Sequence, residues 1–114
     1  MPSLRVIQVH GFGKEALSER EGLAAVVSPG SRSRSPWARQ VALRLGPLLG
    51  TGVRVYPDET QLLGGTRNAQ ARLLQAYPRA RFIHLELSAS TRRALSSEEQ
   101  VACMATALLA PEED

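Results

Sequence analysis

The chain has 114 residues, of which 43% are hydrophobic, 4% are aromatic and 22% are charged. This length suits one domain with a single core, and the hydrophobic share excludes a disordered chain. The net charge of +3 rests on arginine, because Lys14 is the only lysine. The basic residues are dispersed and have no interleaved aromatic stripe, so we expect no nucleic-acid partner.

The single cysteine, Cys103, excludes an intrachain disulfide and a zinc site built from several cysteines. We expect it to pack as a small apolar residue in the last helix. The N-terminus shows no basic segment followed by an apolar one, and no apolar run approaches the ~20 residues that span a bilayer. These features predict a soluble cytoplasmic protein without a membrane partner.

The first half of the chain predicts two short strands followed by a long helix. The β-branched residues Val6, Ile7 and Val9 indicate a strand over residues 4–10, and residues 23–27 form a second apolar run. Residues 14–21 are charged and favour a loop or a short helical turn. Ser35 and Pro36 are a typical helix start, as N-cap and first helical residue. The predicted helix ends near Leu49, with this buried stripe: Trp37, Val41, Leu45 and Leu48.

The second half predicts two more strands, over residues 53–56 and 81–87, and two more helices. Residues 57–66 form a loop that contains Gly64 and Gly65, and a short helix follows over 67–77. Either Ser96 or Ser97 can cap the last helix, with Glu99 or Gln100 completing a capping box. The expected buried residues of these two helices are Leu73 and Leu74, then Val101, Met104, Ala105 and Leu108.

Strands that alternate with helices predict a single α/β domain over residues 1–114. We expect three layers, α/β/α, around a mainly parallel or mixed sheet of about four strands, with helices on both faces. If the sheet is parallel, the loops after its strands meet at one edge. Those loops carry His10, residues 28–35, Asp58 and the stretch after Glu86.

The fourth predicted strand carries the strongest functional signal. Its alternation places Ile83, Leu85 and Leu87 on one face. His84 and Glu86 then share the other face, near the strand's C-terminal end. An unpaired carboxylate is costly in an apolar strand, so Glu86 needs a partner. That partner is a catalytic or metal site, or an ion pair with Arg92 or Arg93. His84 either orients Glu86 or simply fills space.

Two further segments favour a site beside this strand. His10 ends the first predicted strand next to Gly11, where it is placed to act as a metal ligand or a general base. The alternative is a histidine that only forms a hydrogen bond in a turn. Residues 64–68 lead into a helix whose free N–H groups could bind an anion, with Asn68 at its start. The alternative there is an ordinary turn with an asparagine or threonine cap.

The order of these motifs resembles a known family of enzymes. The motifs are Val6-Ile7-Gln8-Val9-His10-Gly11-Phe12, Val26-Val27-Ser28-Pro29-Gly30, Leu63-Gly64-Gly65-Thr66, and His84-Leu85-Glu86-Leu87-Ser88 followed by Arg92. Together they resemble the C-terminal half of the N-formylglutamate amidohydrolase family, and its relatives the poly-gamma-glutamate hydrolases and zinc carboxypeptidases. The resemblance covers roughly residues 4 to 100.

The resemblance implies a zinc-dependent hydrolase that cleaves an amide bond next to a carboxylate. It implies that His10 is a zinc ligand, with His84 a weaker candidate, and that Glu86 is the general base. Gly64 and Gly65 would line the substrate pocket, where we also place Asn68, and Arg92 would contact the carboxylate of a small or peptide-like substrate. The oligomeric state stays open.

The family's other two zinc ligands lie in a His-x-x-Glu-like element before its first strand, and residues 1–3 carry no such element. Three explanations stay open: the chain lacks an N-terminal metal-binding part, its site is rearranged around His10, His84 and Glu86, or it needs a second chain. The main alternative function is a non-catalytic α/β binding domain that keeps the fold without metal. Nucleic-acid binding through Arg32 and Arg34 ranks last.

Overall fold

The computed structural model describes residues 4–12, 22–61, 63–77 and 79–112, so the segment predicted over 14–21 lies outside the described residues. The strands are β1 (Leu4–Phe12), β2 (Ala25–Ser28), β3 (Val53–Val55) and β4 (Ala80–Ser88). The helices are α2 (Pro36–Leu49), α3 (Ala69–Leu74), α4 (Ala89–Ala94) and α5 (Glu98–Leu109). None of these helices is long and apolar enough to cross a membrane.

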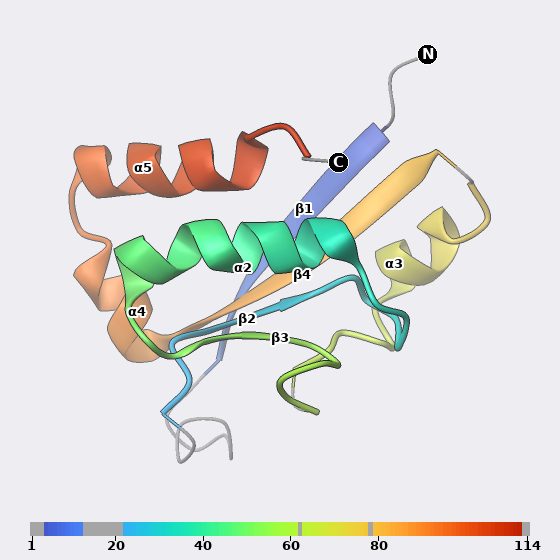
Figure 1. Cartoon of the computed structure of the whole chain (residues 1–114), viewed down its shortest axis with the longest axis horizontal. Helices are drawn as coiled ribbons and strands as arrows, with labels where there is room; N and C mark the ends of the chain where they lie inside the picture. Colours follow the sequence, from blue (N-terminus) through green and yellow to red (C-terminus); the bar gives the residue numbers. More distant parts are fainter. Residues whose placement is uncertain (1–3, 13–21, 62, 78, 113–114) are drawn as a thin grey trace.

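The four strands form one mixed sheet in the order β1-β4-β2-β3. β1 pairs with β4 and β2 pairs with β3 in parallel, whereas β2 and β4 are antiparallel. The predicted α/β class and four-stranded sheet are confirmed. The prediction that the loops meet at one edge is wrong, because the antiparallel pair reverses β2 and β3 (Figure 1). Asp58 therefore lies at the opposite end of the sheet from the stretch after Glu86.

The two faces of the sheet are covered differently. Ile83 and Leu85 are fully buried on the face over which α2 and α5 lie (Figure 1). His84 and Glu86 project from the other face. There α3 reaches the sheet through Ala71, which lies beside Phe82, and the segment around Gly65 contacts His84. Within the described residues, this second face also carries a small apolar cluster of Phe12, Leu23, Val26 and Tyr56, beside which the polar side chains lie.

Local capping sets the helix boundaries. The Ser35 hydroxyl accepts a hydrogen bond from the Ala38 backbone N–H at 3.1 Å, and Pro36 occupies the first turn, as predicted. For α5 the structure selects Ser97 as the N-cap, with Gln100 completing the capping box. α4 was not predicted. It begins directly after β4 because the Ser88 side chain accepts from the Thr91 backbone N–H.

Some expected core residues are exposed. In α2, Trp37, Val41 and Leu45 are buried but Leu48 is 44% exposed. Leu73 in α3 is 63% exposed and Val101 in α5 is 50% exposed. The physical reason in α3 is its start at Ala69, which turns Ala71 toward the sheet. These predictions, and that of a packed Cys103, which is exposed, were wrong.

Candidate metal centre

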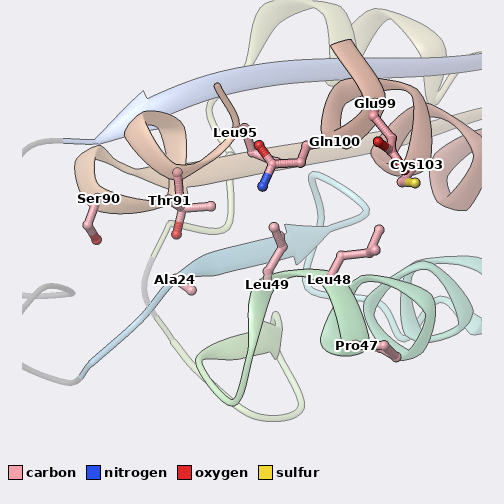
Figure 2. Close-up of a pocket in the computed structure, with 11 residues that line it drawn as sticks. Ala24, Pro47, Leu48, Leu49, Ser90, Thr91, Leu95, Glu99, Gln100 and Cys103 are labelled. Atoms are coloured by element: carbon pink, nitrogen blue, oxygen red, sulfur yellow. The ribbon is translucent and has the colours of Figure 1, made fainter. Parts of the chain in front are cut away.

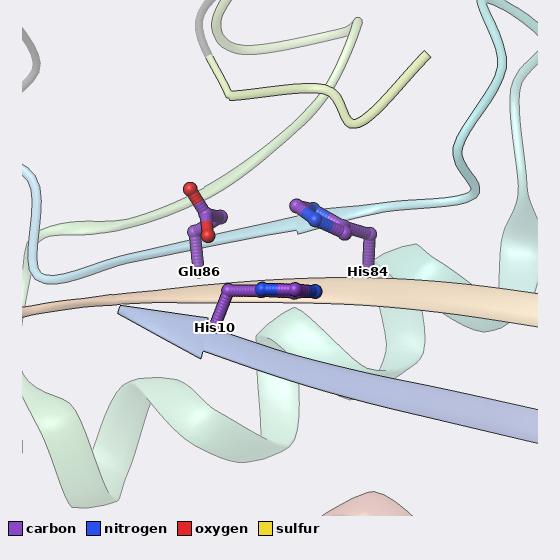
Figure 3. A group of neighbouring side chains, drawn as sticks. All are labelled: His10, His84 and Glu86. Atoms are coloured by element: carbon purple, nitrogen blue, oxygen red, sulfur yellow. The ribbon is translucent and has the colours of Figure 1, made fainter. Parts of the chain in front are cut away.

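Three side chains with metal-binding atoms meet on the second face of the sheet. His10 on β1 and Glu86 on β4 are register partners in the parallel pair, so they point the same way. His84 lies two residues before Glu86 and shares its face (Figure 3). The ligand atoms of the three residues all lie within 4.8 Å of one another, in a group that could hold a metal ion.

His84 is the buried member of this group, with 7% of its surface exposed. Its ring stacks on that of His10 with centroids 4.8 Å apart, and the Phe82 ring lies 6.4 Å away. Its Nδ1 is buried and forms no hydrogen bond within the described part of the chain. Burial, and then the charge of His10, lowers the pKa of His84 to about 4. The ring is therefore neutral at pH 7 and keeps a lone pair for a metal.

Glu86 is half-buried beside the two imidazoles. Burial raises the pKa of Glu86, and the nearby His10 and Arg92 oppose that rise. Among the residues that the structure describes, Glu86 takes part in no ion pair, so the ion-pair alternative with Arg92 or Arg93 is not observed. A buried carboxylate without a bound cation is costly, and a metal ion would offset that cost.

His10 lies within β1, because the strand continues to Phe12. The strand therefore does not end at His10 as predicted, and Gly11 is part of it. This glycine allows close packing: a Cβ at Gly11 would lie 2.4 Å from Cζ of Arg92. The Arg92 Nη2 donates to the Phe12 carbonyl at 3.1 Å. Since Gly11 is the register partner of Leu87, whose side chain is buried under the helices, the guanidinium lies on that side of the sheet.

Of the two glycines expected to line the substrate pocket, Gly65 lies against His84. A Cβ at Gly65 would lie 2.7 Å from Cγ of His84, so the backbone there rests on the imidazole. Gly64 packs against the Tyr56 ring, where a Cβ would lie 2.5 Å away. The predicted pocket-lining segment is therefore beside His84, although its two glycines contact different rings.

Asn68 caps α3, since its Oδ1 accepts from the Ala71 backbone N–H at 3.0 Å. Its Nδ2 donates to Oε1 of Gln8, and the Gln8 Nε2 donates to Oε1 of Gln70. Gln8 is the register partner of His84, so this amide chain borders the metal-binding group. The sequence reasoning missed Gln8, although its place two residues before His10 puts both on one face of β1.

The donor set suits zinc, a metal ion of intermediate softness that binds both nitrogen and oxygen ligands. Two imidazoles and one carboxylate are a known catalytic zinc set, in which a fourth position stays open. Tetrahedral ligands at about 2.0–2.1 Å from zinc lie about 3.3 Å apart. The three side chains would therefore need to close in modestly, through rotations about their own bonds.

A sizeable cavity lies away from this group. It has a volume of about 480 Å³ and lies between α2, α4 and α5 (Figure 2). Leu48, Leu49 and Leu95 line it, and the side-chain Oε1 of Gln100 on its wall already accepts capping bonds. Within the described part of the chain, the group of side chains that could hold a metal ion is that of His10, His84 and Glu86, none of which lines this cavity.

Comparisons of the chain with family models, with curated proteins and with solved structures find no match. The resemblance to zinc amidohydrolases therefore rests on the short motifs alone.

Proposed function

We propose that the chain is a zinc-dependent hydrolase that acts on an amide bond next to a carboxylate, with His10, His84 and Glu86 as the metal ligands. The observation that carries this proposal is the meeting of two imidazoles and a carboxylate within 4.8 Å. The neutral state of His84 supports a ligand role.

Each side chain has a distinct task in this proposal. A bound zinc ion would polarise the amide carbonyl and lower the pKa of a water molecule. Glu86 has two carboxylate oxygens, so one can bind the metal while the other accepts a proton. Burial raises the Glu86 pKa, which makes this carboxylate a stronger proton acceptor. His10 is exposed, so substrate approaches from its side of the group.

The substrate's carboxylate needs hydrogen-bond donors close to the metal. Gln8 is the register partner of His84, and the amide groups of Gln8, Asn68 and Gln70 keep N–H groups beyond those they use with one another. Arg92, the residue named by the family resemblance, is exposed at the end of β1 but already contacts the Phe12 carbonyl. We therefore place the carboxylate beside the amide chain.

The alternative is a binding domain that keeps the α/β fold without metal. One observation favours it: Asn68 and Arg92, both expected to hold substrate, make a helix cap and a backbone contact. The two functions are distinguished by whether the chain binds zinc, because only the hydrolase requires it.

The test is equilibrium dialysis of the metal-free chain against zinc, followed by hydrolysis assays on N-acyl amino acids and short peptides. We expect one zinc per chain, and a loss of binding in His10→Ala, His84→Ala and Glu86→Gln. The matched control Glu98→Gln changes an exposed carboxylate on α5 and should bind zinc normally. If Glu86→Gln keeps its zinc but loses hydrolysis, Glu86 is the base and not a ligand. A folded wild-type chain without stoichiometric zinc contradicts the proposal.

A further inference from the structure

The buried hydroxyl of Ser28 fastens the glycine turn to the sheet. Ser28 ends β2, is fully buried and is the register partner of His84 on β4. Its hydroxyl donates to the Gly64 carbonyl at 2.5 Å and accepts from the Gly30 backbone N–H at 3.0 Å. One side chain therefore joins the end of β2 to the turn that covers the metal-binding group.

The turn fits between two rings with no space for a side chain. At Gly65 the backbone has φ +64°, a conformation that favours glycine. A Cβ there would lie 2.7 Å from Cγ and 2.8 Å from Nδ1 of His84. Gly64 meets the Tyr56 ring on its own side. The His84 imidazole is thus enclosed by Gly65 and by the stacked ring of His10.

This packing replaces an interaction that metal-binding histidines ordinarily have. Such a histidine usually donates its second ring N–H to an oxygen, which fixes the ring orientation. For His84 no such partner is observed among the described residues, since its Nδ1 is buried without a hydrogen bond. Contact with the glycine backbone is the remaining restraint on that side of the ring.

We infer that Ser28 and the Gly64–Gly65 turn are a positioning element that holds the His84 ring in its ligating orientation by steric contact. This inference rests on the proposed metal-dependent function and deepens it. Ser28 acts through the turn and does not itself touch the metal. Loss of the Ser28 hydroxyl releases the Gly64 carbonyl, and the turn can then move off the ring.

The first test compares two glycine substitutions with equal backbone strain. Gly65→Ala adds strain at φ +64° and also a clash with His84, whereas Gly22→Ala adds strain at φ +70° with no described atom within 4 Å of the new Cβ. We expect zinc affinity to fall 10- to 100-fold in Gly65→Ala, the range typical for lost ligand orientation, and to stay unchanged in Gly22→Ala. Equal zinc affinity in the two folded variants would overturn the inference.

A second pair of substitutions tests the inference if Gly65→Ala does not fold. Ser28→Ala removes the hydroxyl that holds Gly64, and Ser35→Ala removes a hydroxyl that accepts instead from the Ala38 backbone N–H of α2. We expect weaker zinc binding and an altered Co²⁺ absorption spectrum only in Ser28→Ala, with Ser28→Thr restoring both. Unchanged zinc affinity and Co²⁺ spectrum in a folded Ser28→Ala contradict the inference.

An NMR measurement on the metal-free chain tests this inference independently of the proposed function. In the metal-free chain, NMR should show a nuclear Overhauser contact between the His84 ring and the Gly65 α-protons. This contact should persist in Ser35→Ala and vanish in Ser28→Ala. If it does so while wild type binds no zinc, the hydrolase proposal fails and the positioning of His84 stands. If the contact survives in Ser28→Ala, the positioning role is wrong whatever the zinc result.

Discussion

At the scale of single residues, the ionisation of His84 follows from burial without a hydrogen-bond partner. The neutral ring tolerates this environment, whereas a charged ring would lose its hydration. The residue that we propose as a metal ligand therefore resists protonation. This behaviour gives the folded chain a measurable dependence on pH.

The stability of the chain should rise with pH between about 4 and 6.5. The folded-state pKa of His84, about 4, lies below its ordinary value of 6.5, so the unfolded chain binds more protons in this window. The His84 contribution is thus present above pH 6.5 and is lost as the pH falls to 4, by up to about 3 kcal/mol. Urea unfolding at a series of pH values measures it.

Substitutions can separate the contribution of His84 to the pH dependence of stability from that of Glu86. Glu86 acts in the opposite direction, because its raised pKa makes stability fall as the pH rises above 4.5. We expect His84→Asn to remove the rise, and His10→Asn to keep most of it, since burial is the larger cause of the shift. The same slope in wild type and His84→Asn would contradict a depressed His84 pKa.

The sequence could predict only part of the candidate site. Alternation along one strand is a local property, so the shared face of His84 and Glu86 followed from the residues alone. The pairing of His10 with Glu86 depends on the register between strands about 70 residues apart, which no local pattern sets. The contact of Gly11 with Arg92 could not be predicted for the same reason.

At the scale of elements, side-chain caps decide where helices start. Ser35 and Ser97 were both foreseen as caps, because serine before a helical pattern has a direct physical role. Which face a short helix buries was not foreseen. Leucine spacing in α3 suggested Leu73, but the cap at Asn68 fixes the phase of the helix, and Ala71 faces the sheet.

The capping box of α5 gives a test at this scale. Ser97 accepts from the Gln100 backbone N–H at 3.1 Å, whereas no hydrogen bond of the Ser96 side chain is observed among the described residues. We expect Ser97→Ala to destabilise the chain by about 1 kcal/mol and Ser96→Ala to have little effect. Thermal unfolding of the two variants, which differ by one position, measures this. Equal losses would contradict the assignment of the cap.

At the scale of the whole molecule, one antiparallel pairing decides where the chemistry lies. A fully parallel sheet would collect its loops at one edge, and that expectation follows from the alternation of strands and helices. Because β2 is antiparallel to β4, the polar loops that follow the strands lie at two opposite ends of the sheet. The group of His10, His84 and Glu86 instead lies on one face near the C-terminal ends of β1 and β4, where two strands far apart in sequence lie side by side.

The two faces of the sheet are covered unequally, and this allows polar side chains to lie on one of them. α2 and α5 bury Ile83 and Leu85, so this face supplies the larger apolar cluster. Among the described residues, the other face carries α3, the glycine turn and a smaller apolar cluster that includes Val26, so it can also hold imidazole and carboxylate groups, with access to solvent at His10. The sequence patterns predicted α2, α3 and α5 but not this division, which depends on how the helices pack.

The central claim is that His10, His84 and Glu86 together bind one metal ion, and anomalous X-ray diffraction from crystals grown with zinc tests it most directly. The account predicts a single peak at the zinc edge, about 2.0–2.2 Å from an imidazole nitrogen of each histidine and from a Glu86 oxygen. An ordered site with no anomalous peak between these three side chains would contradict it.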